Sequence, residues 1–384
     1  MGRASVGEAS TRMAGGGNAE SAASVKIRPV GGRPSNCPGS PRRCRCARSR
    51  LDAPTGSMAN EQYVPTTSQA NVRLDHPPVN PPSAPAEFNR LPAPTGNVRE
   101  APVTSQSATG EIVLSGLAAS AASPPRGLIV ALHGSGMHAG YYHAPVDPSL
   151  SLLELAATVG FDVWAPDRPG SGASAHLGFV PLAEQATMLL DAIDAYTDGR
   201  DVGAGVVLVA HSYGLKVALT MAATERGARL LGLDGAGTGS EYTEFPPRRV
   251  EPEERARGHR GPAWGPEVLY PAGTFARGGL PLDPTPIGDR RSEGRAWPQM
   301  LAEIGPRITI PVRLTFAEHE GFWRTDAGSM SLLRRHLRNA VPLTIEAEPG
   351  AGHNTSLGLA ARAYHLKVVA FAESCVLRRQ MATN

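Results

Sequence analysis

The sequence predicts an α/β fold, in which a mostly parallel central sheet of about eight strands is flanked by helices on both faces. Short, continuous apolar runs recur along the chain, such as Gly-Leu-Ile-Val-Ala-Leu-His at residues 127–133, and runs of this kind are typical of strands buried on both faces. Longer segments with apolar residues at helical spacing lie between them, for example residues 181–197. Strands that alternate with helices in this way form parallel sheets, and ligands bind at the carboxyl ends of their strands.

The expected elements begin at about residue 98. Residues 98–106 and 111–117 interleave polar with apolar residues and predict a short antiparallel pair. Buried strands are then expected at residues 127–133, 161–166, 205–210, 230–233, 308–316 (interrupted by Pro311) and 343–347. Helices are expected at residues 150–160, 181–197, 214–223, 329–339 and 360–378.

Residues 238–306 break this alternation. The segment is rich in Pro, Gly, Arg and Glu, and loops of this length are usually functional or disordered. Its aromatic residues argue against simple disorder; they are Tyr242, Phe245, Trp264, Tyr270, Phe275 and Trp297. We therefore expect a lid inserted between two strands of the sheet.

Residues 1–97 differ in composition from the rest of the chain. They are rich in Pro, Gly, Ser and Ala and contain two aromatic residues, Tyr63 and Phe88. Such a segment cannot bury enough apolar surface to offset the entropy of ordering it. We expect a disordered N-terminal extension over residues 1–97 and one folded domain over residues 98–384. Met58 begins a plausible polar N-terminus, and a translation start there would make residues 1–57 an upstream artefact.

The charge and the cysteines exclude several classes of partner. The net charge is +3, but residues 1–57 carry ten Lys or Arg and three Asp or Glu, so the rest of the chain is net negative and no nucleic-acid partner is expected. The cysteines have neither zinc-site spacing nor a disulfide framework; they are Cys37, Cys44, Cys46 and Cys375. There is no complete secretory signal and no apolar run near 18 residues. We expect a cytoplasmic protein that does not bind a membrane.

The strongest motif surrounds Ser212. The apolar strand at residues 205–210 runs directly into Ala-His-Ser-Tyr-Gly and then into a helix, which matches the nucleophile elbow G-x-S-x-G in its strand–turn–helix context. The turn is so tight that the residues two before and two after the serine must be small, and Ala210 replaces the first glycine. The N-terminal end of the helix favours developing negative charge. We predict that Ser212 is a nucleophile; the alternative is an ordinary turn with a serine helix cap.

A second motif, His133-Gly134-Ser135-Gly136, follows the strand at residues 127–133. Residues 134–139 also fit the dinucleotide fingerprint G-x-G-x-x-A, but the acidic residue expected about 20 positions later is missing. Three histidines recur at intervals of five, His133, His138 and His143, yet no carboxylate or cysteine completes a metal site. Neither a dinucleotide nor a metal is expected.

Together with Asp167-Arg168-Pro169-Gly170-Ser171-Gly172 after the next strand, these motifs resemble the α/β-hydrolase family, over about residues 98–384. The resemblance implies an α/β-hydrolase fold with an inserted lid. It also implies an oxyanion hole made by the backbone N–H groups of Ser135 (or Gly136) and Tyr213.

The family's late histidine turn resembles Gly-Ala-Gly-His at residues 350–353, which makes His353 the expected base. Histidine suits this task because its pKa lies near neutral pH, and the chain order of serine, acid and histidine agrees. The family's acid segment resembles residues 311–320 and places the acid at Glu320. Glu318 and Asp234 are the alternative acids.

These residues imply nucleophilic acyl transfer. We expect a serine hydrolase that cleaves a carboxylic ester, or a thioester, of a small apolar acyl substrate through an acyl-enzyme, with no metal and no organic cofactor. One alternative is an acyltransferase or a cofactor-free perhydrolase on the same triad. Another is a ligand-binding protein that has kept the fold without turnover, since Ala210 departs from the elbow pattern.

Overall fold

The computed structural model describes residues 97–107, 110–245, 247, 249, 251–283 and 290–383. The predicted N-terminal extension lies outside the described residues, Asn97 excepted, and so does the alternative start at Met58. None of the helices in this described part combines the length and the hydrophobicity that crossing a bilayer requires.

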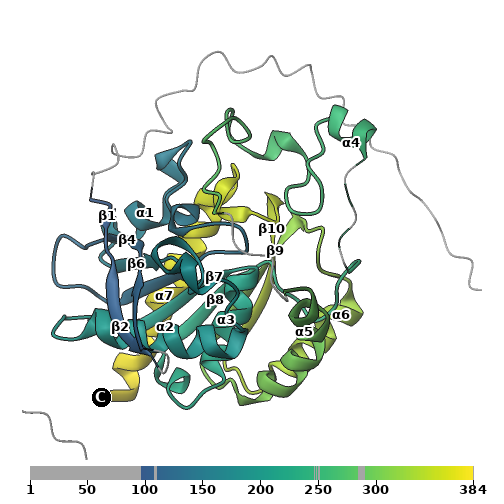
Figure 1. The fold of residues 1–384 in the computed structure, drawn as a ribbon. Coiled ribbons are helices and arrows are strands. Elements are labelled where there is room, and N and C mark those ends of the chain that lie inside the picture. The colour runs from purple at the N-terminus through teal and green to yellow at the C-terminus, as the bar shows by residue number, and fades with distance from the viewer. Residues whose placement is uncertain are drawn as a thin grey trace, which may run out of the picture. The chain divides into compact units, whose positions relative to one another are not determined.

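An eight-stranded, mostly parallel sheet forms the centre of the fold, as predicted (Figure 1). Its spatial order is β1-β4-β6-β5-β7-β8-β9-β10; the strands from β6 to β10 run parallel, and β1 and β4 are antiparallel to their neighbours. The strands are β1 (Arg99–Glu100), β4 (Gly116–Ala119), β5 (Leu128–Leu132), β6 (Asp162–Pro166), β7 (Val206–His211), β8 (Gly232–Ala236), β9 (Val312–His319) and β10 (Leu343–Gly352). A separate antiparallel pair, β2 (Val103–Ser107) and β3 (Gly110–Leu114), forms near the expected position.

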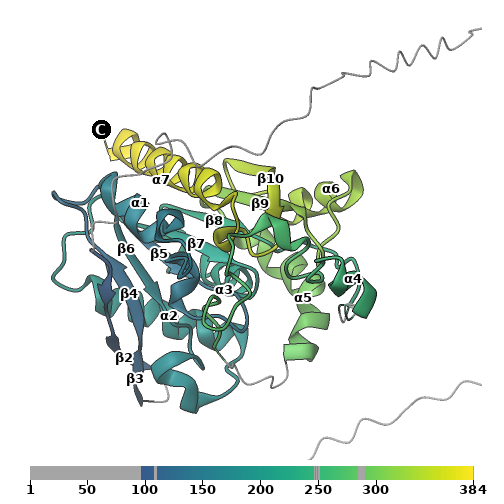
Figure 2. The ribbon, with the colours of Figure 1, turned by 90° about the horizontal axis from the view of Figure 1, so that it is seen from above.

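Helices cover both faces of the sheet (Figure 2). In chain order they are α1 (Leu152–Thr158), α2 (Leu182–Thr197), α3 (Tyr213–Ala222), α4 (Pro252–Ala256), α5 (Arg290–Ile304), α6 (Ala327–His336) and α7 (Ala361–Thr383). Side chains alternate along β5: Leu128, Val130 and Leu132 pack on the α2–α3 face. Ile129 and Ala131 pack on the α1–α7 face. The strand is therefore buried on both sides, which explains its continuous apolar sequence.

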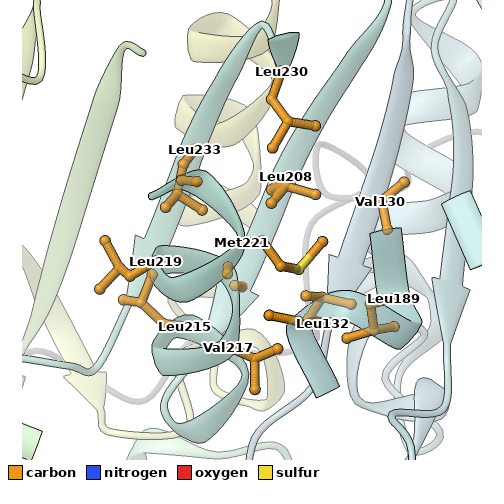
Figure 3. Close-up of a cluster of buried hydrophobic side chains, with 14 of the residues drawn as sticks. Val130, Leu132, Leu189, Leu208, Leu215, Val217, Leu219, Met221, Leu230 and Leu233 are labelled. Atoms are coloured by element: carbon orange, nitrogen blue, oxygen red, sulfur yellow. The ribbon is translucent and has the colours of Figure 1, made fainter. Parts of the chain in front are cut away.

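The packing of α3 on the sheet fixes the turn that precedes this helix. Figure 3 shows α3 side chains, Leu215 and Met221 among them, beside Leu208 of β7 and Leu233 of β8, and all four are buried. Burial of one such side chain contributes about 1.5–3 kcal/mol relative to its exposure. The first residue of the helix consequently has little freedom to move relative to the end of β7.

Several elements differ from the sequence-based expectation. Each member of the expected antiparallel pair is divided into two short strands, β9 begins and ends later than expected, β10 is longer, and the insertion contains the short helix α4. The strand expected at residues 230–233 lies at Gly232–Ala236, because the buried Asp234 in its middle pairs with Arg313 of β9. The insertion contains a 15-residue helix, α5, where no helix is expected, and Pro298 lies inside it. A charge in a buried strand and a proline in a helix both contradict local sequence rules.

Candidate active site

Ser212 lies between β7 and α3 in a backbone conformation that residues other than glycine rarely adopt. Its φ and ψ are 51° and −116°. Such strain costs on the order of 1–3 kcal/mol and persists only where the surroundings enforce it. Here the Ser212 N–H donates to the Ala236 carbonyl (2.8 Å), and the Thr238 hydroxyl donates to the Ser212 carbonyl (2.7 Å). The end of β8 thus holds the turn.

The small residues of the motif are required by neighbouring backbone. A Cβ at Gly214 would lie 2.4 Å from the Leu132 oxygen and 2.5 Å from the His133 oxygen. Ala210 is fully buried and pairs with Leu132 of β5 and Gly235 of β8. The alanine that departs from the motif therefore fits within the sheet at the end of β7.

A chain of hydrogen bonds connects Ser212 to a carboxylate through His353. The Ser212 Oγ lies 3.0 Å from His353 Nε2. His353 Nδ1 lies 3.0 Å from both carboxylate oxygens of Glu320. The side chains of His353 and Glu320 are 3% and 2% exposed, which shields their interaction from water. The Phe322 N–H donates to Glu320 Oε1 (2.9 Å) and orients the carboxylate.

The two alternative acids lie elsewhere. Glu318 is exposed and accepts a hydrogen bond from the Gly350 N–H (2.8 Å). Asp234 is fully buried within β8 and forms an ion pair with Arg313, and the Tyr364 hydroxyl donates to it (3.4 Å). Burial raises the pKa of Asp234 to about 6, and the Arg313 charge opposes this rise. Of the three candidate carboxylates, the structure brings Glu320 to His353.

His211 is a site residue that the sequence analysis did not single out. Its Nε2 donates to the His353 carbonyl (2.8 Å), and its ring stacks on Tyr141 with 4.6 Å between ring centres. Burial and the neighbouring His353 lower the pKa of His211 well below its usual value, so its imidazole is neutral. His211 therefore fixes the backbone of the residue that contacts Ser212. Its position directly before the serine is the signal that could have identified it.

The loop after β5 lies against the serine. A Cβ at Gly134 would lie 3.3 Å from Ser212 Cβ and 2.7 Å from His211 Nδ1, so this position requires glycine. Ser135, one of the predicted oxyanion donors, follows Gly134 and is exposed. Tyr213, the other predicted donor, is the first residue of α3.

Arg168 connects both parts of this predicted oxyanion hole. Its guanidinium is buried and donates to the carbonyls of His133 (2.9 Å) and Gly134 (3.3 Å). It also lies 4.9 Å from the ring centre of Tyr213. Burial and the Arg168 charge lower the pKa of His133 well below its usual value, so its ring is a neutral member of this loop.

In the described part of the chain, no three or more His, Cys, Asp or Glu side chains cluster as metal ligands would. His138 Nδ1 accepts a hydrogen bond from the Gly140 N–H (3.0 Å), and His143 Nδ1 bonds the Ser151 hydroxyl (3.0 Å). The histidines at intervals of five are thus engaged in local contacts.

The inserted segment lies between β8 and β9 and contacts the histidine loop. The Asn354 side chain donates to the Ala263 carbonyl (2.7 Å), and the Leu359 N–H donates to the Leu269 carbonyl (2.8 Å). Trp264 forms an edge-on aromatic cluster with Tyr270 and Phe275. The insertion therefore covers the loop that carries His353.

The sheet order and the helices on both faces define an α/β fold. Ser212 lies in the turn between the carboxyl end of a central strand, β7, and the helix α3. The family described as "Alpha/beta hydrolase family" matches residues 129–364, and the chain belongs to this family.

Solved structures agree with this fold. A thermostable carboxyl esterase from Bacillus coagulans is similar over 72% of this chain and 99% of its own, with 17% identity and a TM-score of 0.55. DcsB in complex with its substrate analogue matches over 73% and 99%, with 16% identity and a TM-score of 0.51. An open-form lipase matches over 72% and 99%, with 19% identity and a TM-score of 0.50. The comparison with curated proteins finds no match.

Proposed function

We propose that the protein is a serine hydrolase that cleaves carboxylic esters of small apolar acyl substrates, with Ser212 as nucleophile, His353 as general base and Glu320 as acid. The unbroken hydrogen-bond chain from Glu320 through His353 to Ser212 carries this proposal. The family, and the esterase and lipase among the similar structures, support it.

In the first half-reaction, Ser212 Oγ attacks the ester carbonyl carbon while its proton passes to His353 Nε2. Glu320 accepts the hydrogen bond of Nδ1–H, holds this tautomer and stabilises the imidazolium that forms. The tetrahedral intermediate then collapses, the C–O bond to the alcohol breaks, and His353 returns the proton to the departing oxygen. The acyl group remains on Ser212.

In the second half-reaction, water gives a proton to His353 and its oxygen attacks the acyl carbon. Collapse of this intermediate releases the carboxylic acid and restores the serine hydroxyl. In both steps the oxyanion is stabilised by the N–H groups of Ser135 and Tyr213, and the loss of one such donor typically costs about 10²–10³ in kcat. We assign these donors because Gly134 lies against Ser212 and Tyr213 begins α3.

The surroundings of the base favour an apolar acyl group. The Phe322 ring lies edge-on to the His353 ring with 4.6 Å between their centres, and Phe322 is half-buried. An aromatic surface beside the base binds alkyl or ring-bearing acyl groups by hydrophobic contact.

The proposal is tested with a fluorophosphonate probe and with p-nitrophenyl esters of increasing acyl length. The probe is expected to label Ser212 and the enzyme to hydrolyse p-nitrophenyl butyrate. Ser212→Ala is expected to remain unlabelled and to lose about 10⁶-fold in kcat, as other triad serines do.

Ser331→Ala is the matched control, because Ser331 lies exposed on α6. The probe is expected to label this variant, and its kcat is expected to equal that of the wild type. Hydrolysis that persists in Ser212→Ala would disprove the proposal, and so would a wild type that neither labels nor cleaves any ester of the series.

A further inference from the structure

Lys216 is a buried lysine one helical turn after Ser212. It is 7% exposed, and its ammonium donates a hydrogen bond to the Tyr242 hydroxyl (2.7 Å). The Nζ atom also lies 5.3 Å from the ring centres of Tyr242, Trp297 and Trp323. A cation within about 6 Å of an aromatic ring is attracted to it when it lies over the ring face. Lys216 therefore occupies an aromatic cage formed by these three rings.

The cage joins three segments that are distant in sequence. Tyr242 belongs to the first part of the insertion, Trp297 to α5, and Trp323 follows the acid Glu320 by three residues. The Tyr242 and Trp323 rings stack with 4.1 Å between their centres. The lysine thus attaches all three segments to the helix that begins at the nucleophile.

Main-chain and side-chain hydrogen bonds make these segments one unit. The Thr243 N–H donates to the Phe322 carbonyl (2.8 Å), and the Arg324 N–H donates to the Glu241 carbonyl (2.9 Å). The Trp297 indole N–H donates to the Gly239 carbonyl (3.0 Å). A displacement of Tyr242 would consequently displace the backbone of residues 322–324.

This unit reaches the triad through Phe322. The Phe322 N–H donates to the Glu320 carboxylate, and its ring contacts His353. A continuous path of contacts therefore runs from Lys216 through Tyr242 and Phe322 to the acid and the base.

We propose that Lys216 is a positioning residue, which holds the loop of Glu320 and the start of the insertion in register with Ser212. The inference rests on the proposed function, since it concerns the alignment of the same triad. Lys216 and Ser212 share the first turns of α3, so whatever binds the ammonium is fixed relative to the nucleophile.

The electrostatics of the site agree with a role beyond packing. Burial lowers the pKa of Lys216 to about 7, and the Glu293 carboxylate of α5 opposes this fall. An apolar side chain of similar length would fill the cage without this desolvation cost. The amino group gives what an apolar chain lacks, a directional hydrogen bond with the Tyr242 hydroxyl, and below pH 7 its positive charge is also attracted to the three ring faces.

The test compares Lys216→Met, Lys216→Arg and Tyr242→Phe with the wild type in p-nitrophenyl butyrate hydrolysis and in the rate of fluorophosphonate labelling. Lys216→Met keeps the aliphatic chain and is expected to lower kcat 10- to 100-fold with KM within twofold, and to slow labelling by a similar factor. Lys216→Arg restores a nitrogen donor to the Tyr242 hydroxyl and is expected to recover most of kcat. Tyr242→Phe keeps the ring and removes the hydrogen bond, with an expected three- to tenfold loss.

Lys367→Met is the matched control, because Lys367 is a half-exposed lysine of α7 that pairs with Glu348. It is expected to match the wild type. A Lys216→Met variant whose kcat stays within twofold, or whose loss lies entirely in KM, would overturn the inference. If Lys216→Met does not fold, Tyr242→Phe tests the inference instead, and an unchanged kcat in Tyr242→Phe would overturn it. A fully active Ser212→Ala would instead refute the proposed function.

Discussion

Glu318 and Glu320 are two residues apart but have different surroundings. β9 ends at His319, and the Glu320 N–H donates back to the Ala317 carbonyl (3.2 Å). This turn brings the Glu320 side chain to His353, whereas Glu318 stays exposed beside Gly350. The sequence could narrow the acid to Glu318 and Glu320 in the segment 311–320, and to Asp234 in the preceding strand, but the choice depends on where each strand ends.

Replacement of the two carboxylates should therefore have unequal effects. Glu320→Gln is expected to lower kcat about 10⁴-fold, because a neutral amide cannot stabilise the imidazolium of His353. Glu318→Gln is expected to stay within about twofold of the wild type. Steady-state kinetics with p-nitrophenyl butyrate checks both, and equal losses in the two variants would contradict the assignment of the acid.

His211 and Lys216 show why some site residues could not be predicted. The partner of His211 is a backbone carbonyl 142 residues away, and the three rings around Lys216 come from distant segments. The elbow motif can be recognised in the sequence, because its characteristic residues lie within five consecutive positions. Ser212 could consequently be proposed from sequence, while the residues around it needed the fold.

At the scale of elements, the contact between α3 and β5 determines the geometry of the elbow. Gly214 lies on the carbonyl groups at the end of β5. Gly214→Ala is expected to force the two elements apart, with a loss of about 1–3 kcal/mol in unfolding free energy. It should also lower kcat, because the serine and the loop of Gly134 would lose their contact. Thermal and urea unfolding, with esterase assays, measure these effects.

Gly328→Ala provides the control within another helix. Gly328 lies in the first turn of α6, where a Cβ would meet only the Asp326 carboxylate oxygen at 3.1 Å. Alanine should change the unfolding free energy there by less than about 1 kcal/mol, because its higher helix propensity offsets a small shift of this carboxylate. If Gly214→Ala and Gly328→Ala had the same stability and the same kcat, the turn at Ser212 would not depend on close packing of α3 against β5.

Elements with consistent local signals were predicted well, and those with conflicting signals were not. α2 was expected at residues 181–197 and lies at Leu182–Thr197, since its apolar spacing agrees with its burial. α5 was missed because it contains Gly294 and Pro298 in a polar sequence, yet Trp297 and Leu301 are fully buried. Tertiary packing there outweighs a weak helical propensity.

For the molecule as a whole, the position of α5 limits what the insertion can do. Trp297 and Leu301 belong to the same core cluster as α3 and the sheet, so this helix is a fixed part of the domain. A lid remains our prediction, and it applies to the residues of the insertion between Thr243 and α5, because Tyr242 and Thr243 are bound to Lys216 and Phe322. The alternation of strands and helices predicted the sheet, but not which part of the insertion joins its core.

The buried ammonium of Lys216 should also govern how global stability depends on pH. A lysine in the unfolded chain keeps its proton up to about pH 10.4, whereas in the folded protein burial lowers the pKa to about 7. Between these values the unfolded state binds more protons, so the unfolding free energy rises with pH. Below pH 7 both states carry the proton, and the destabilisation by the buried charge is constant.

From pH 7.5 to 9 the unfolding free energy of the wild type should therefore rise by about 2 kcal/mol relative to that of Lys216→Met. Burial lowers the pKa of His133, His211 and His365 and raises that of the Cys375 thiol, but these groups are common to both proteins and cancel in the difference. Urea unfolding at several pH values measures this difference, and parallel curves for the two proteins would mean that Lys216 keeps an ordinary pKa in its cage.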